Sequence, residues 1–143
     1  MTTTYGLDHK LDADAAAIFL FSGNAVFSIK NPRTGKHMTF KVRRTKDAKM
    51  YLVYVLTGES WAYVGCVFMD MPMELRKGRK GMAYNTQSFQ AASWVFRRLG
   101  NLRKDLTGAE FWHAGQCGRC GRALTDPESI ECGIGPVCRG KKK

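Results

Sequence analysis

Residues 24–44 read NAVFSIKNPRTGKHMTFKVRR, two runs of alternating apolar and polar side chains on either side of a turn. Pro32 and Gly35 mark the turn, because proline fixes φ and glycine accepts left-handed backbone. An alternation with a period of two is typical of a strand that buries one face. The stretch therefore predicts an antiparallel hairpin, around which the rest of a sheet can form.

Pairing of the two runs separates the hairpin into an apolar face and a basic, polar face. The apolar face would carry Ala25, Phe27, Ile29, Met38, Phe40 and Val42. The other face would carry Ser28, Lys30, His37, Thr39, Lys41 and Arg43. Because an antiparallel sheet can face water on one side, we expect the first set in the core and the second on the surface. The neighbouring segments contain Tyr51, Tyr54 and Tyr63, whose faces the sequence leaves open.

A second strand pair is expected from residues 50–56 and 61–68, which flank the turn TGES. Both runs are rich in aromatic and β-branched side chains, the residues that favour strands. The expected fold class is α+β, with a small antiparallel sheet of about four strands, covering helices and a C-terminal zinc knuckle or finger.

Two helices are expected beside the strands. An alanine-rich run predicts a helix over about 13–21, with Asp12 or Asp14 as its cap. A second helix would end at Gly100. Its apolar positions recur at helical spacing along one face, which should cover the sheet: Phe89, Ala92, Phe96 and Leu99.

Four of the five cysteines lie close together, at Cys117, Cys120, Cys132 and Cys138. A CxxC pair on a glycine-rich turn can bring two thiolates onto one tetrahedral ion. Disulfide oxidoreductases place this motif at the start of a helix, whereas here it lies among glycines with further thiols close behind. In a reducing compartment, clustered cysteines are more often metal ligands than disulfides. The pattern therefore predicts one structural Zn²⁺ per chain.

The spacing leaves the fourth ligand open. Four thiolates would complete a site, but His113 stands just upstream of Cys117. Cys132 lies before the turn at Gly135 and Pro136, and it could point away from the ion. Both a four-cysteine shell and a shell of three cysteines and one histidine are ordinary for structural zinc.

The stretch HAGQCGRCGRALTDPESIECGIGPVC resembles a domain of unknown function at the C-termini of small proteins, many of them encoded by bacteriophages. The pattern is a histidine, CxxCGR, LTxPxSI and GIGPxC, matched at His113, Cys117, Cys120, Gly121, Arg122, Leu124, Thr125, Pro127, Ser129, Ile130, Gly133, Ile134, Gly135, Pro136 and Cys138. The upstream stretches GNAVFSIKNPRTGKHMTFKV and YVLTG also resemble the N-terminal part of such proteins. The family has no established activity, so the resemblance bears on the metal site and on a viral origin.

The resemblance implies a particular ligand set for the zinc ion. The metal ligands would be His113, Cys117, Cys120 and Cys138, with Cys132 as the alternative fourth ligand. The expected organisation of the chain is then a flexible N-terminus (1–11), an α+β domain (12–104), a zinc-binding domain (105–140) and a basic tail (141–143).

The chain is strongly basic, with 23 lysines and arginines against 12 acidic residues and a formal net charge of +11. A field of this sign draws polyanions, so we expect nucleic acid, DNA or RNA, as a partner. Three basic surfaces could contact it: Lys30, Lys41 and Arg43; Arg76, Lys77, Arg79 and Lys80; and Arg119, Arg122, Lys141, Lys142 and Lys143. Sequence-specific reading is not indicated, because no groove-reading helix is recognisable.

A different class of function fits the same charge: a protein that inhibits or redirects a host polymerase, nuclease or defence factor. Methionines make adaptable contact surfaces and support this alternative: Met69, Met71, Met73 and Met82. No catalytic constellation is visible, so we do not expect an enzyme. No apolar run is long enough to span a membrane, so we expect a cytoplasmic protein, in the host cytoplasm if it is viral.

Overall fold

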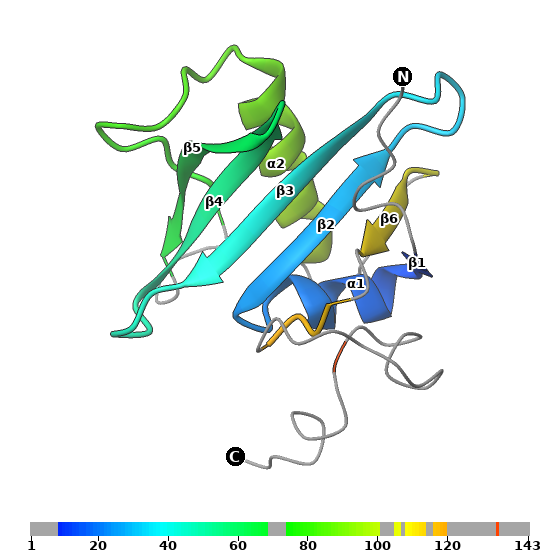
Figure 1. Cartoon of the computed structure of the whole chain (residues 1–143), viewed down its shortest axis with the longest axis horizontal. Helices are drawn as coiled ribbons and strands as arrows, with labels where there is room; N and C mark the ends of the chain where they lie inside the picture. Colours follow the sequence, from blue (N-terminus) through cyan, green and yellow to red (C-terminus); the bar gives the residue numbers. More distant parts are fainter. Residues whose placement is uncertain are drawn as a thin grey trace.

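The computed structural model describes residues 9–68, 74–100, 105–106, 108–113, 116–119 and 134. Within them, a six-stranded antiparallel sheet carries two helices on one face (Figure 1). The elements in chain order are β1 (His9–Leu11), α1 (Ala13–Leu20), β2 (Asn24–Lys30), β3 (His37–Arg44), β4 (Met50–Thr57), β5 (Ser60–Phe68), α2 (Gln87–Leu99) and β6 (Glu110–His113). The expected α+β class is confirmed.

The hairpin of β2 and β3 forms in the register that the alternation predicts. Phe27 pairs with Phe40, and the flanking apolar residues pair in the same way. The turn is closed by the backbone N–H of Gly35, which donates to the carbonyl of Asn31 at 2.7 Å. Gly35 has a φ of 77°, a conformation that glycine adopts without strain. The second strand pair, β4 with β5, is also confirmed.

The number of strands is a correction, since the sheet has six strands within the described residues instead of about four. The strand order is β1-β6-β2-β3-β4-β5. β1 lies in the segment expected to be a flexible N-terminus, and β6 lies beyond the domain boundary expected after residue 104. Both strands are short and pair with segments remote in sequence, so neither carries a long alternating pattern. The sheet therefore takes in residues from both sides of that boundary.

Of the two caps expected for α1, Asp12 is the one observed, and α2 has a side-chain cap at Thr86. The Asp12 carboxylate accepts from the backbone N–H of Ala15 at 2.8 Å. The Thr86 hydroxyl accepts from the N–H of Phe89 at 3.2 Å, and α2 ends at Gly100. The expected apolar face of α2 is buried. Neither of these helices is long and apolar enough to cross a membrane.

Aromatic rings join the helices to the middle of the sheet. The Phe27 ring stacks on Phe111, with centroids 4.5 Å apart, and lies 5.8 Å from the ring of Phe40. Phe19 of α1 meets Phe111 edge-on at 6.1 Å. All four rings are buried. Such pairs add roughly 0.5–1.5 kcal/mol each beyond the burial of their surface, so β6 is tied firmly into the core.

Replacement of Phe111 by alanine tests this place of β6. We expect the change to lower the free energy of unfolding of the sheet by about 3–5 kcal/mol, because a fully buried ring leaves a cavity. Trp112→Ala is the matched control, since Trp112 is only half-buried, and it should cost less than half as much. Urea unfolding followed by the strand signal in circular dichroism measures both. If Phe111→Ala left that transition unchanged, β6 would belong to a separate folding unit.

Candidate metal centre and nucleic-acid interface

His113 is the first of the predicted metal ligands, and it lies on the face of β6 that points into the core. The strand buries Phe111 and His113 and leaves Trp112 on the opposite face. His113 pairs with Phe27 in the sheet, and its ring centroid lies 5.4 Å from that of Phe19. A fully buried imidazole must have its polar atoms satisfied, and metal ligation is one way to do so.

Cys117 is the second predicted ligand, and it is also fully buried. It begins a turn in which the backbone N–H of Arg119 donates to the Cys117 Sγ at 3.4 Å. Cysteine binds a metal as the thiolate, whose sulfur can accept such a backbone hydrogen bond. The start of the CxxC motif therefore has a geometry suited to ligation.

The turn of Cys117 is packed against α1 and the beginning of β2. The backbone N–H of Asn24 donates to the carbonyl of Gly118 at 2.6 Å, and the Asn24 side-chain amide donates to the carbonyl of Arg119 at 3.3 Å. A side chain at Gly118 would have its Cβ 2.7 Å from Cδ1 of Phe19 and still closer to the Ser22 hydroxyl. Only glycine fits at position 118 without a shift of its neighbours. Phe19 lies beside both His113 and the cysteine turn.

The remaining predicted ligands, Cys120, Cys132 and Cys138, lie outside the described residues, as do Arg122 and Lys141, Lys142 and Lys143. Among the residues that the structure does describe, no three histidine, cysteine or acidic side chains are grouped so that they could hold a metal ion. The ligand set as a whole stays a prediction. What the structure contributes is the position of His113 and of the turn at Gly118, which both lie beside Phe19.

The face of the sheet opposite the helices carries aromatic and basic side chains together. Lys41 pairs with Tyr54, and Tyr54 pairs with Tyr63. The Lys41 ammonium lies 5.2 Å from the centroid of the Tyr54 ring and 4.8 Å from that of the Trp61 ring. The rings of Tyr54 and Tyr63 are 5.6 Å apart. We call these four half-buried residues, Lys41, Tyr54, Trp61 and Tyr63, the aromatic platform.

Partial burial alters the proton equilibria of the platform. Burial lowers the pKa of the Lys41 ammonium, and the neighbouring charge of Arg43 lowers it further. Burial, with a contribution from Cys66, raises the pKa of Tyr63 to about 12. The phenol is therefore neutral at physiological pH and adds no negative charge to the face.

The basic loop, Arg76, Lys77, Arg79 and Lys80, lies along the edge of β5 that does not pair with β4. Two backbone hydrogen bonds of 2.8 Å join Arg76 to Cys66. Gly65 permits this approach, because a Cβ there would lie 2.5 Å from the carbonyl oxygen of Arg76. Glu74 pairs with Arg76 at 3.4 Å. The structure thus places the basic loop at β5, with β4 between that strand and Lys41 and Arg43 of β3, and it places Lys30 farther away on β2.

The polar face of the hairpin differs from the expected one in its centre. Ser28 and Thr39 are buried, and their hydroxyl oxygens are 2.6 Å apart. Ser28 lies between Thr39 of β3 and Trp112 of β6, which the four-strand prediction lacked. Lys30 and Lys41 are half-buried and Arg43 is exposed, so the cations of this face remain accessible.

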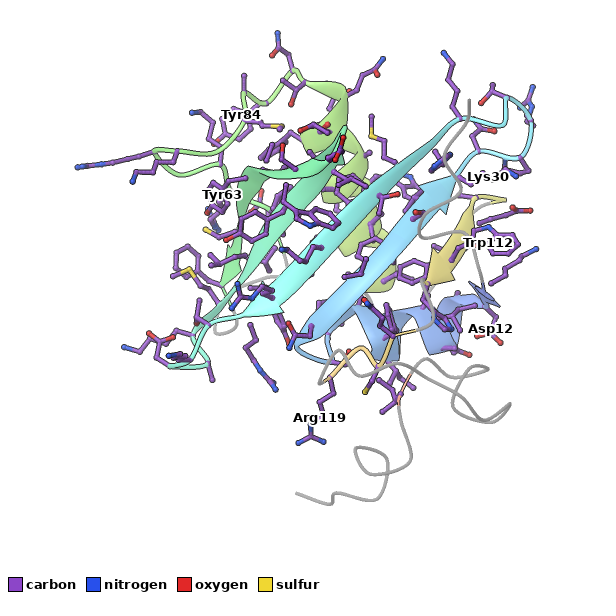
Figure 2. All side chains as sticks on the ribbon, in the orientation of Figure 1. Asp12, Lys30, Tyr63, Tyr84, Trp112 and Arg119 are labelled. Carbon is purple, nitrogen blue, oxygen red and sulfur yellow. The ribbon has the colours of Figure 1, made fainter. Side chains whose placement is uncertain are left out.

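The sequence left the faces of two tryptophans unassigned, Trp61 of the platform and Trp112 of β6. Trp112 lies on the face opposite the core, and its Nε1 donates to Glu110 at 3.1 Å. Glu110 also pairs with Lys10 at 3.6 Å. Tyr63 and Trp112 lie at opposite ends of the sheet (Figure 2). Successive side chains of a strand point to opposite faces of the sheet. The buried residues Val53, Val55 and Phe111 are therefore the signal that could have placed their neighbours on the outer face.

Comparison with known proteins reaches only the C-terminal part of the chain. A model of a family of unknown function, DUF6011, matches residues 108–142. No curated protein and no solved structure shows significant similarity to the chain. The matched segment includes β6 and all the predicted zinc ligands. The C-terminal segment is therefore similar to a family of unknown function, as its motifs predicted. The match does not bear on the predicted zinc ion or on a viral origin.

Proposed function

We propose that this protein binds single-stranded nucleic acid, DNA or RNA, without sequence specificity, and that one structural zinc ion holds its C-terminal segment. The observation that carries the proposal is the aromatic platform, in which Lys41 lies over the rings of Tyr54 and Trp61 beside Tyr63. Nothing in the proposal requires a reaction.

Single strands suit this surface better than a duplex. Unpaired bases expose their flat faces, which stack on aromatic side chains, while nearby cations track the phosphates. The platform provides the rings, and the exposed Arg43 and the basic loop provide cations on either side. The two described helices lie on the opposite face of the sheet and present no recognition helix beside the platform.

The zinc ion would be held by His113, Cys117, Cys120 and Cys138, with Cys132 as the alternative fourth ligand. The burial of His113 beside Phe19, and of Cys117 next to the turn at Gly118, supports the first two. When bound, the ion would hold these side chains together and stabilise the fold without catalytic chemistry. Its effect would reach the sheet through the hydrogen bonds between Asn24 and the turn at Gly118.

The bacteriophage origin that the resemblance implies is also part of this proposal, with a host cell as the setting. The rival function, inhibition or redirection of a host protein, is separated from nucleic-acid binding by affinity capture from host extract. Partners that disappear after nuclease treatment support the proposal. A protein partner that persists supports the rival.

We expect one equivalent of zinc per chain in the purified protein by elemental analysis. His113→Asn should lose most of this zinc, because a missing ligand opens the shell, whereas Cys132→Ser should retain it. Folding of both variants is checked by circular dichroism of the strands. Retention of zinc in His113→Asn together with its loss in Cys132→Ser would show that Cys132, and not His113, is the fourth ligand.

Gly118→Ala tests whether the packing of the turn supports the metal site. The added methyl group would overlap Phe19 and Ser22, so the turn must shift, and we expect zinc affinity to fall at least tenfold in a competition with a chelator. Gly35→Ala is the control, because a Cβ there meets nothing within 4 Å and only strains a distant turn. Equal zinc affinities in the two variants would contradict a metal site at this turn.

Nucleic-acid binding should depend steeply on salt, because neutralised phosphates release counterions. About five contacts on a single strand would give a log–log slope near −3.5, at roughly 0.7 per contact. Replacing all four cations of the basic loop by alanine should flatten this slope, whereas Lys46→Ala with Lys49→Ala, in the exposed β3–β4 turn, should change it little. Anisotropy of a labelled oligonucleotide measures both.

Aromatic variants separate stacking from charge in the same assay. Tyr54→Leu and Trp61→Leu should each weaken binding about tenfold with an unchanged slope, since stacking contributes about 1–3 kcal/mol per base and releases no ions. Tyr84→Leu is the matched control, because Tyr84 is exposed outside the platform. Absence of affinity for any single strand at low salt would refute the proposal.

A further inference from the structure

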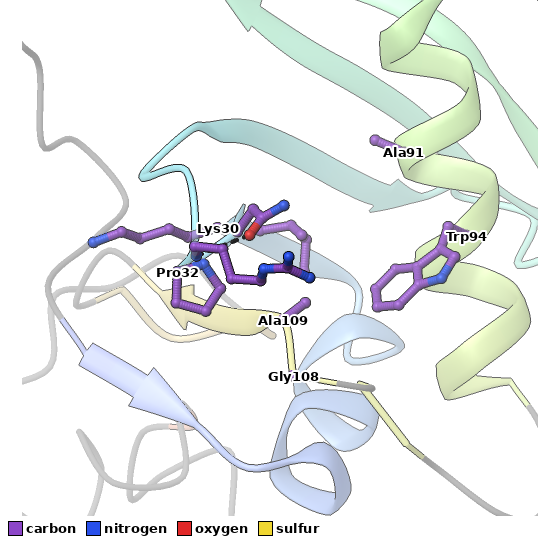
Figure 3. A pocket seen from close by; sticks show the side chains of 9 residues that line it. Lys30, Pro32, Ala91, Trp94, Gly108 and Ala109 are labelled. Carbon is purple, nitrogen blue, oxygen red and sulfur yellow. Dashed lines mark hydrogen bonds between the residues drawn. The ribbon is translucent and has the colours of Figure 1, made fainter.

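A cleft lies on the other side of the sheet from the platform, between the β2–β3 hairpin and α2. Its volume is about 380 Å³. Ala91 and Trp94 of α2 form one wall, and Pro32 and Ala109 form the other (Figure 3). A second hollow of about 680 Å³ adjoins it, because the two share Ile29, Asn31 and Ala91. These volumes fall in the range of small-molecule sites, roughly 300–1,000 Å³.

The cleft combines an aromatic wall with a positively charged rim. Trp94 is half-buried, and the guanidinium of Arg98 lies 5.6 Å from its ring centroid. Arg33 and Lys36 come from the hairpin turn, and both are exposed. None of the described residues that line the two hollows is acidic. The amides of Gln87 and Gln90 add hydrogen-bonding groups to the second hollow.

We infer that this cleft binds a nucleotide, with its base against Trp94 and its phosphate at Arg33 and Lys36. A planar base matches an indole wall, and arginine pairs with phosphate through two parallel hydrogen bonds. The nucleotide could be a free mononucleotide or the end of a strand, and the two share the same chemistry. The inference does not rest on the platform, which lies on the opposite face of the sheet.

An extended peptide fits the cleft less well. The hairpin beside it has its backbone already paired: the N–H of Asn31 donates to Lys36 at 2.9 Å, and the N–H of Gly35 donates to Asn31 at 2.7 Å. β2 is paired on both sides, with β3 and β6. A peptide would therefore find no free strand edge here, and strand addition depends on such an edge.

Titration with adenosine 5′-monophosphate, followed by the indole N–H signals in two-dimensional NMR, tests the inference. We expect the Trp94 signal to shift and the signal of Trp112, which lies on the opposite face of the sheet, to stay in place. Arg33→Ala with Lys36→Ala should weaken binding at least tenfold, because both changes remove exposed cations and leave the core intact. Lys46→Ala with Lys49→Ala, which removes two cations elsewhere, should leave the affinity unchanged.

Further titrations identify the part of the ligand that is bound and its source. Inorganic phosphate and adenosine should each bind at least tenfold more weakly than the monophosphate, and equal binding of phosphate alone would overturn the inference. If only an oligonucleotide shifts Trp94, and Ala91→Leu abolishes this shift by filling the cleft, the strand end is the source. If neither probe shifts Trp94, the inference is wrong. Tyr54→Leu should not alter this signal, which keeps the result independent of the platform.

Discussion

The pairing of β6 with β2 is the contact on which the rest of the structure depends. It places Phe111 on Phe27, with the rings 4.5 Å apart, and it turns His113 into the core beside Phe19. Three of the four residues of β6, Phe111, Trp112 and His113, also pair with β1, so the N-terminal strand has no place in the sheet without them. A short strand from the end of the chain thus closes the sheet and delivers the first predicted metal ligand to the interior. At this point the segment that contains the first predicted metal ligand is part of the sheet and of its core.

The alternation of side chains then divides the molecule into two chemically distinct sides. Phe27, Phe40 and Val42 face the helices and form the core, while Lys41 faces the other way among aromatic rings. Because the helices cover only the apolar face, the basic and aromatic residues of β3, β4 and β5 are left available for a ligand. A cation over a ring binds favourably at such a partly desolvated position, which orders the lysine before any ligand arrives. In the proposed function, an ordered surface would lose less conformational entropy on binding. The packing of the sheet therefore already orders the platform for the proposed ligand.

Much of this could be predicted from local sequence. The hairpin, the β4–β5 pair, the Asp12 cap and the buried face of α2 each follow from a pattern within about twenty residues. β1 and β6 escaped prediction because three or four residues carry too little periodicity, and their partners are remote in the chain. The face of Tyr54 and Trp61 depends on strand register, which only the neighbouring buried valines define. The cleft could not be predicted at all, since it is lined by a turn, a helix and the approach to β6. Local patterns specify elements, whereas sites made between elements require the tertiary structure.

Two glycines show how separate segments are fitted to this sheet. Gly65 allows the carbonyl of Arg76 to approach β5, so that the basic loop continues the platform, and Gly118 allows the cysteine turn to lie against Phe19. At each position even a methyl group would collide with a neighbouring segment, and backbone hydrogen bonds hold the contact: Cys66 with Arg76, and Asn24 with Gly118. Neither glycine has a positive φ, so the requirement is for space and not for an unusual backbone conformation. The sheet is therefore the support to which the basic loop and the turn at Gly118 are attached by close backbone contact. Because each attachment uses its own hydrogen bonds, the position of the basic loop and the position of the turn at Gly118 are determined separately, and a change in one need not displace the other.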